Sequence, residues 1–321
     1  MIKFRLVAVL VMACMLLGGC SAFGKDIFFT FEPGIGSVFK IGEMSCPESE
    51  ARVYIANSYN VYGKGNAVSL WDLDINTEKL KENVAERILD NLTMVYAMNV
   101  YAKEYDISLS DADEEMIDKA ASDYMSTLSD KDKEYLDVSQ KDIKKMYTHL
   151  LLARNVYSSL MASVDDDVSE DEARVMQAYV IKVSDGKALK SVKKDLAAGI
   201  SIEEIAASYS EDGGDAVSFP RNTYPVAVED VAFSLDNGET SDVIEEAGSF
   251  YVIHCIEKND ATLSEENKIR IIETRKTELI ESIIQGQHSK YYSGLDQDKW
   301  KELSKKPANE VTTDKFFSTL G

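Results

Sequence analysis

The stretch ASYSEDGGDAVSF, residues 207–219, sets two glycines between two aspartates, just after a short helical pattern and just before an aromatic residue. Glycine permits backbone turns that other residues resist, and aspartate side chains bond to backbone N–H groups in such turns. Asp212 can therefore be a carboxylate beside a substrate groove, or it can belong to a tight, solvated turn. The segments around the loop decide between these two interpretations.

Both sides of this loop show strand and helix patterns. Runs of β-branched and aromatic residues predict strands, and capping residues followed by apolar residues at three- and four-residue spacing predict helices. In chain order we expect a strand at Met176–Val183, a helix at Asp185–Ala198 ended by Gly199, a short helix opened by Ser201, a helix near Val228–Leu235, and strands near Ser241–Glu245 and Ser249–Glu257.

Amphipathic helices are predicted before and after that segment. Residues 76–105 carry the clearest helical pattern, with apolar residues at three- and four-residue spacing and charged residues between them. Further helices are expected from a capping-box spacing at Ser45 to about Tyr59, after the caps Ser110 and Ser139, and over Ser264–Tyr292.

Methionine and tyrosine recur on or near the apolar faces of the helices before the loop segment. An adaptable apolar surface for client proteins is one interpretation. An ordinary helical core is the favoured one, because such stripes usually pack inward. Asp165–Asp167 breaks the helical pattern and predicts a solvated linker, since no calcium-loop glycine and distal glutamate follow it.

The first twenty residues predict an export signal. Lys3 and Arg5 form a positive start, Leu6–Leu17 is an apolar run too short to span a bilayer, and Leu-Gly-Gly precedes Cys20. This ending resembles the bacterial lipobox, whose cysteine is acylated and becomes the first mature residue. We expect residues 1–19 to be a lipoprotein signal peptide and Cys20 to be the lipidation site. A plain signal peptide is the alternative.

The chain is strongly acidic, with a formal net charge of −21 at pH 7. Nucleic acid is therefore not expected as a partner, because phosphate binding needs clustered lysine and arginine. An exported compartment permits a disulfide between Cys46 and Cys255, whereas two buried free thiols are the favoured alternative. The three histidines are scattered, and neither a metal nor a cofactor is expected.

Residues 176–258 resemble a parvulin, the small peptidyl-prolyl isomerase domain. The resemblance rests on the order and spacing of several short matches rather than on any one of them. Ile205-Ala206 and Tyr209-Ser210 match the family's Leu-Ala…Tyr-Ser run, and Gly213-Gly214-Asp215 with Phe219 matches its Gly-Gly-Asp-Leu-Gly-x-Phe. Residues 228–241, VEDVAFSLDNGETS, match its Phe-Glu-x-Ala-Ala-Phe-x-Leu-x-x-Gly-Glu-x-Ser. Phe250–Ile253 stands at its Gly-Tyr-His-Ile-Ile.

The lipobox, the N-terminal helices, the parvulin-like segment and the returning C-terminal helix are together similar to the PrsA and SurA type of extracytoplasmic foldases. The resemblance implies an α+β fold: a discontinuous all-helical chaperone module, like the N-terminal module of SurA, with an inserted parvulin domain. That domain has a small antiparallel four-stranded sheet with surrounding helices. The implied divisions are a tether and first strand at 20–44, the helical module at 45–170, the parvulin-like domain at 172–260, and a C-terminal helix and tail at 262–321 that return to the helical module. Pairing of VTTDKFF, residues 311–317, with a strand near Val38–Ile41 is a further hypothesis.

Rotation about an X-Pro bond needs no cofactor and no proton transfer, but it crosses a barrier of about 18–20 kcal/mol. A catalyst needs an apolar pocket for the proline ring and polar groups aimed at the twisted imide. The resemblance places Asp212 at the family's Cys or Asp position, and Tyr179 and Tyr251 at its two histidine positions. These three are the expected catalytic residues, and strand alternation puts His254 on the opposite face from Tyr251. The expected substrate-binding residues are Tyr224, Val228, Phe219 and Phe233.

The resemblance implies a membrane-anchored extracytoplasmic peptidyl-prolyl cis-trans isomerase and foldase that assists the folding of secreted proteins. The expected partners are unfolded or partly folded secreted polypeptides with X-Pro bonds. The expected location is the outer face of a Gram-positive plasma membrane, reached through the lipid on Cys20. Because both histidine positions carry tyrosine, a non-catalytic holdase that keeps the parvulin fold is the alternative.

Overall fold

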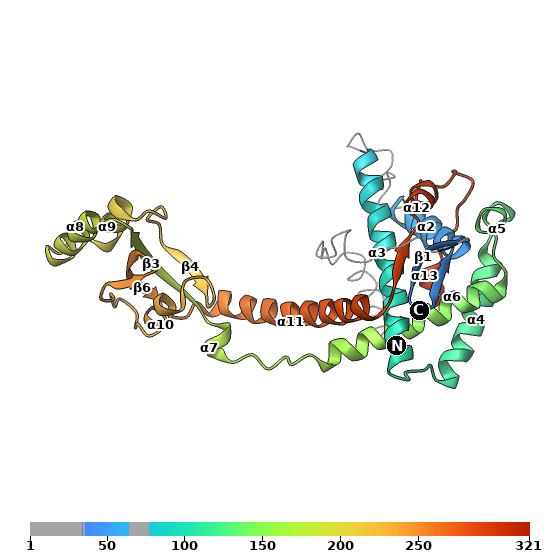
Figure 1. The fold of residues 1–321 in the computed structure, drawn as a ribbon, viewed down its shortest axis with the longest axis horizontal. Helices are drawn as coiled ribbons and strands as arrows, with labels where there is room; N and C mark the ends of the chain where they lie inside the picture. Colours follow the sequence, from blue (N-terminus) through green and yellow to red (C-terminus); the bar gives the residue numbers. More distant parts are fainter. Residues whose placement is uncertain (1–33, 35, 64–76) are drawn as a thin grey trace. The chain divides into compact units, whose positions relative to one another are not determined.

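The computed structural model describes residues 34, 36–63 and 77–321 (Figure 1). The chain divides into two compact units: the described residues up to Ser163 together with Ile280–Gly321, and Val164–Leu279. The expected signal peptide, Cys20 and residues 21–33 of the expected tether lie outside the described residues. Within the described ranges, no helix has both the length and the apolar character needed to cross a bilayer.

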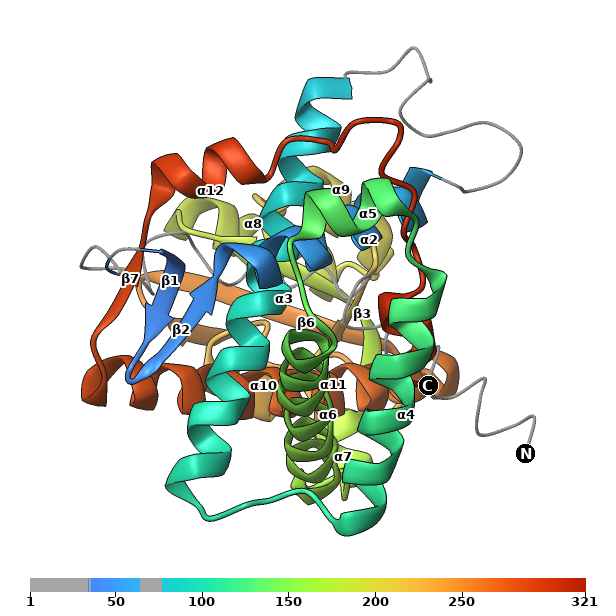
Figure 2. The same cartoon turned by 90° about the vertical axis from the view of Figure 1, so that its right-hand side faces the viewer.

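Helices make up most of the first unit, and α6 packs against both α3 and α4 (Figure 2). The expected α+β class, with small antiparallel sheets, is confirmed. The helices of this unit are α2 (Glu48–Gly63), α3 (Thr77–Glu104), α4 (Asp111–Thr127), α5 (Asp130–Leu136), α6 (Gln140–Ser163), the end of α11 (Ala261–Lys290), α12 (Gln297–Leu303) and α13 (Phe316–Thr319).

Two of the expected helix caps are formed as predicted. Ser110 and Ser139 each accept a bond from the backbone of an aspartate three residues later, and that aspartate accepts one in return. The expected start at Ser45 is wrong by three residues, because Ser45 pairs with Lys40 in a sheet and α2 begins only at Glu48.

A three-stranded antiparallel sheet belongs to this unit, so the module is not all-helical. Strand β1 (Ser37–Ile41) lies between β2 (Met44–Pro47) and β7 (Ser293–Leu295). The third strand has only three residues, too few to show an alternating pattern. The hypothesis that VTTDKFF pairs with β1 is wrong. Strand β1 pairs with β2 on one side and with β7 on the other, and residues 311–317 pack among helices.

Residues 311–321 are bound to the N-terminal helices by a buried polar network and by ring packing. Asn57 Oδ1 accepts from Phe316 N at 3.0 Å, and its amide donates to Tyr124 at 2.9 Å. The Phe316 ring stacks on Tyr147 with centroids 4.6 Å apart. Tyr124 and Tyr147 are fully buried, so for these residues the ordinary-core interpretation of the tyrosine stripe is confirmed.

The second unit is built on a four-stranded antiparallel sheet of order β4-β3-β6-β5, as expected (Figure 1). Of its strands, β4 went unpredicted, because Val217–Pro220 is short and ends in proline. The strands are β3 (Val175–Val183), β4 (Val217–Pro220), β5 (Ile244–Glu246) and β6 (Ser249–Glu257), and the helices are α7 (Glu170–Ala173), α8 (Gly186–Ala197), α9 (Ile202–Tyr209), α10 (Val226–Ala232) and the start of α11.

Each face of this sheet supports its own apolar cluster. Cluster A contains α10 side chains such as Val228 with the alternate sheet residues Val180 and Ile253. Cluster B contains α8 and α9 side chains such as Val192 and Ile205 with Ile181 and Val252. Alternate residues of β3 and β6 therefore serve different cores.

Cys46 and Cys255 are both buried free thiols, as the favoured interpretation predicted. They belong to different units of the chain. Burial raises the pKa of both thiols, which keeps them protonated and unreactive.

Asp132 provides a test of the network that holds the tail. Its carboxylate caps α5 through Ser129 and accepts from Thr312 N at 2.7 Å and Thr313 N at 3.0 Å. Burial acts to raise the pKa of this carboxyl, but these bonds outweigh burial and hold the pKa below its ordinary value. A depressed folded-state pKa stabilises the protein above the unfolded value near 3.9, and this contribution is lost as the pH falls through the folded-state pKa.

We expect Asp132→Asn to lower the free energy of unfolding of the first unit by about 1–3 kcal/mol at pH 7, and by less below pH 4. Urea unfolding followed by tryptophan fluorescence measures this, because the second unit contains no tryptophan. Asp130→Asn, at an exposed position in the same turn, is the matched control. Equal losses for both variants, or a loss independent of pH, would contradict the assigned role.

Gly214 provides a test of the loop after α9. Its φ is +79°, and a Cβ there would lie 2.5 Å from the carbonyl oxygen of Ala206. Gly213 also has a positive φ, of +100°, but a Cβ there would meet nothing within 4 Å. We expect Gly214→Ala to cost about 3 kcal/mol or more and Gly213→Ala about 1 kcal/mol. Hydrogen exchange of the β3 and β6 amides measures both; equal exchange rates in the two variants would count against the steric argument.

Candidate functional site

The loop that carries Asp212 is hydrogen-bonded to the C-terminal part of β3 through side-chain and backbone groups. Ser210 Oγ donates to Val180 O at 3.1 Å, and Glu211 N donates to Lys182 O at 2.9 Å. The Glu211 carboxylate accepts from the backbone N–H of Ser184 at 2.7 Å. These bonds fix the start of the loop against the sheet, while Asp212 itself lies in an exposed turn.

Asp212 meets a lysine that the sequence interpretation overlooked. Lys182 Nζ lies 3.4 Å from Asp212 Oδ1, and about half of the Asp212 side chain remains exposed. Lys182 is opposite Tyr251 in the pairing of β3 with β6, and opposed residues of an antiparallel pair share a face. Asp212, Lys182 and Tyr251 therefore gather on the α10 side of the sheet.

Tyr179 and Tyr251 do not share a site, and that part of the expectation is wrong. Tyr179 is opposite His254 on the α8–α9 side, where it packs against cluster B, while Tyr251 is buried in cluster A. A shift of one residue moves a strand side chain to the other face, and the carry-over to Tyr179 made that shift. The β3 residues on the Tyr251 face include Ala178, Val180 and Lys182.

His254 lies on the opposite face from Tyr251, as strand alternation predicted. Its Nδ1 lies 2.8 Å from the Thr240 hydroxyl. On the same side, burial and then the carboxylate of Glu203 raise the pKa of Tyr179. His254 and Tyr179 thus belong to the surroundings of α9 and contribute nothing to the Asp212 side.

The other expected residues gather in cluster A together with Tyr251. Phe219 and Val228 are almost completely buried there, while Tyr224 is half-buried and meets the Phe219 ring edge-on at 4.8 Å. Burial raises the pKa of Tyr224 first, and the nearby carboxylate of Asp212 adds to the effect. Tyr224 thus connects the apolar cluster to the polar group at its edge.

Glu229 positions Tyr224, although the sequence interpretation gave it no role. Its buried carboxylate accepts from the backbone N–H groups of Asn222, Thr223 and Tyr224 at 2.9, 2.6 and 2.8 Å. A carboxylate that satisfies three successive N–H groups fixes the turn before α10. The Glu at this place in VEDVAF was the available signal.

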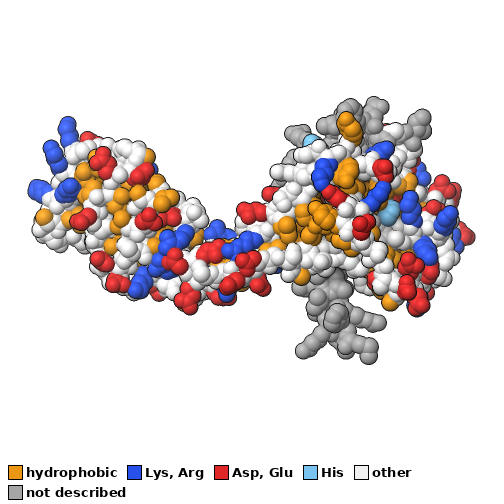
Figure 3. Space-filling model, turned by 60° about the horizontal axis from the view of Figure 1, so that its bottom comes forward, with side chains coloured by type: hydrophobic (Ala, Val, Ile, Leu, Met, Phe, Trp, Pro, Cys, Tyr) orange, Lys and Arg blue, Asp and Glu red, His pale blue; other side chains and the backbone are white. Residues whose placement is uncertain are grey.

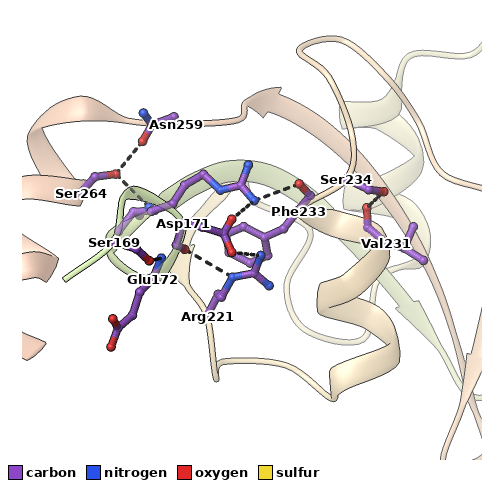
Figure 4. A network of polar contacts seen from close by, with 11 residues as sticks. Ser169, Asp171, Glu172, Arg221, Val231, Phe233, Ser234, Asn259 and Ser264 are labelled. Carbon is purple, nitrogen blue, oxygen red and sulfur yellow. Dashed lines mark hydrogen bonds and ion pairs between the residues drawn. The ribbon is translucent and has the colours of Figure 1, made fainter. Parts of the chain in front are cut away.

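Phe233 also belongs to cluster A, where its ring meets that of Phe219 edge-on at 5.8 Å. The guanidinium carbons of Arg174 and Arg221 lie 4.9 and 4.5 Å from its ring centroid. Asp171 pairs with both, at 2.7 and 2.6 Å (Figure 4). The Phe233 side chain is thus buried beneath these two arginines.

The arrangement suits binding and orientation more than acid–base chemistry. Tyr224 and Tyr251 offer ring surface and hydroxyl groups, and Lys182 with Asp212 supplies a charged pair beside them. No nucleophile paired with a base is present in this group. Across the described ranges, no three His, Cys, Asp or Glu side chains are placed to hold a metal ion.

Residues 163–270 match the family model described as the PPIC-type PPIASE domain. The chain is 28% identical over 178 residues to foldase protein PrsA 2 of Bacillus anthracis, and the match covers 53% of this chain and 61% of that protein. It is 25% identical over 210 residues to foldase protein PrsA 4 of Bacillus cereus, covering 63% of this chain and 72% of that protein. The chain thus spans less than two thirds of the Bacillus anthracis relative.

Two solved structures also resemble the chain. The crystal structure of PrsA from Bacillus anthracis gives a TM-score of 0.31 at 23% identity and covers 62% of this chain and 96% of that one. PrsA from Bacillus cereus gives 0.36 at 20% identity, covering 82% and 99%. On the family match and the curated relatives, residues 163–270 are similar to PPIC-type peptidyl-prolyl isomerase domains, and the chain is similar to the PrsA foldases.

Proposed function

We propose that this protein is an extracytoplasmic foldase, anchored by a lipid on Cys20, whose second unit catalyses rotation about X-Pro bonds. Its substrates would be unfolded or partly folded secreted polypeptides. The observation that carries the proposal is the gathering of Asp212, Lys182, Tyr224 and Tyr251 at the edge of cluster A. The family match and the names of the curated relatives support it.

The proposed mechanism follows from what rotation does to the imide. A planar imide shares the nitrogen lone pair with the carbonyl, and the twisted form loses that resonance, so the nitrogen becomes a better hydrogen-bond acceptor. Aromatic faces at Tyr224 and Tyr251 would receive the prolyl ring and exclude water. A hydroxyl or ammonium donor beside them would stabilise the twisted form more than either planar form.

Within this proposal, Lys182 and Asp212 act as a pair. The ammonium is a compact donor on a flexible stem, and the carboxylate 3.4 Å away restrains where it points. Asp212 would therefore hold a polar rim in place without accepting a proton. This assignment replaces Tyr179, whose side chain lies on the other face of the sheet.

The two tyrosines give a matched pair of variants on opposite faces of one sheet. We expect Tyr251→Phe to lower kcat/KM for a proline peptide by about tenfold to a hundredfold, because it removes one hydroxyl from the site. Tyr179→Phe removes the same group from the α8–α9 side and should stay within about twofold of the unchanged protein. A protease-coupled assay on the full chain measures both rates.

Equal effects of the two substitutions would contradict the placement of the site. A rate for the unchanged chain no higher than the buffer background would contradict the enzymatic proposal altogether. Thermal unfolding of each variant shows whether a lost rate reflects lost folding.

One observation favours the second candidate, a holdase without turnover. On the Tyr251 face of β3, Ala178 and Val180 are apolar, so Lys182 near the end of the strand supplies the polar side chain there. The first unit also exposes apolar side chains on one face (Figure 3). Tyr105 and Met116 are among its exposed large apolar residues. Suppression of client aggregation by a chain that shows no isomerase rate would establish this candidate.

A further inference from the structure

Helix α8 has two chemically distinct sides. Leu189, Val192 and Leu196 recur at three- and four-residue spacing and pack in cluster B. Lys187, Lys190, Lys193 and Lys194 lie on the other side, because a turn of 3.6 residues keeps positions i, i+3, i+6 and i+7 within one arc. The arc formed by these four lysines is called the α8 basic face below.

All four lysines of the α8 basic face are exposed to solvent. Among the residues that the structure describes, no carboxylate forms an ion pair with any of them. The nearest acidic residues along the helix are engaged elsewhere. Asp185 caps the helix by accepting from Lys187 N at 3.1 Å, and Asp195 accepts from the Tyr209 hydroxyl at 2.8 Å.

The face belongs to a chain whose net charge is −21. Some exposed lysines elsewhere pair with carboxylates, as Lys119 does with Asp123 at 2.6 Å and Lys276 with Glu273 at 2.6 Å. Blue side chains gather on the part of the second unit where α8 lies (Figure 3). Four unneutralised positive charges within one helix create a local field despite the negative total, because salt screens charges beyond a Debye length of about 8–10 Å.

We propose that the α8 basic face is a docking surface for a bilayer rich in anionic phospholipid. Lysine ammonium groups are hydrated point charges on flexible stems, which suit a diffuse layer of phosphate groups better than the bidentate recognition of one anion. The exposed Ile200, just after the helix, adds an apolar side chain of the kind that enters a bilayer interface.

The choice of a lipid partner rests on the proposed membrane attachment, which would keep the chain beside such a surface. The lysines themselves are separate from the isomerase proposal, since α8 packs on the opposite sheet face from Asp212 and Tyr251. Docking through α8 would leave the α10 side uncovered.

The test measures vesicle binding by full-length proteins that all carry Cys20→Ser, so that acylation cannot anchor any of them. One protein keeps the four lysines, and the other carries Lys187→Gln, Lys190→Gln, Lys193→Gln and Lys194→Gln. Each lysine near an anionic bilayer contributes about fivefold to partitioning, so the variant should bind phosphatidylglycerol vesicles several hundredfold more weakly. Phosphatidylcholine vesicles should not distinguish the two, and any contribution of the N-terminal apolar run is common to both.

A second variant matches the change in net charge without touching α8. It replaces four lysines that each form an ion pair by glutamine: Lys119, Lys131, Lys144 and Lys276. It should bind anionic vesicles like the unchanged chain. Equal weakening in the two variants, or equal binding by all three proteins, would overturn the proposal. So would tight, lysine-dependent binding to soluble polyphosphate without binding to vesicles. The isomerase rate of the α8 variant should equal that of the unchanged chain, which separates this proposal from the catalytic one.

Discussion

The second unit depends on the antiparallel register of β3 against β6. Because side chains alternate with a period of two, this register assigns every residue of both strands to one of two cores. It puts Lys182 and Tyr251 on the side of α10 and Tyr179 with His254 on the side of α9. Asp212 joins the first pair only because Ser210 and Glu211 bond to the backbone of the same strand.

The sequence predicted the elements that are determined within one segment of the chain, and it did not predict the elements that depend on distant partners. The long helices and their caps were predictable, because apolar spacing and a serine three residues before an aspartate lie within one segment. Strand β7 and the position of VTTDKFF were not, because their partners are more than 250 residues away in the chain. Tertiary pairing also overrode the capping signal at Ser45, since a strand partner took its backbone groups.

In the candidate site, too, some residues were predictable from the sequence and others were identified only by their contacts. Asp212, Tyr224, Val228, Phe219 and Tyr251 were predictable from the resemblance, and the structure brings them to one side of the sheet. Tyr179 was misplaced because a pattern of alternating residues leaves the register open by one. Glu229 stood in the matched run VEDVAF without an assigned role, whereas Lys182 and the Arg174–Asp171–Arg221 group carried no motif of their own. Only their bonding partners make these roles visible.

The binding of residues 311–321 to the N-terminal helices has a consequence for the order in which the chain can fold during synthesis. Asn57 Oδ1 and Asp132 Oδ1 accept hydrogen bonds from residues 312–316, so these two buried oxygens lack those partners until that segment has been made. The second unit, Val164–Leu279, is continuous and has all its strands available earlier. Growth from the N-terminus therefore completes the inserted unit before the unit into which it is inserted, and the long-range contacts of the latter form last.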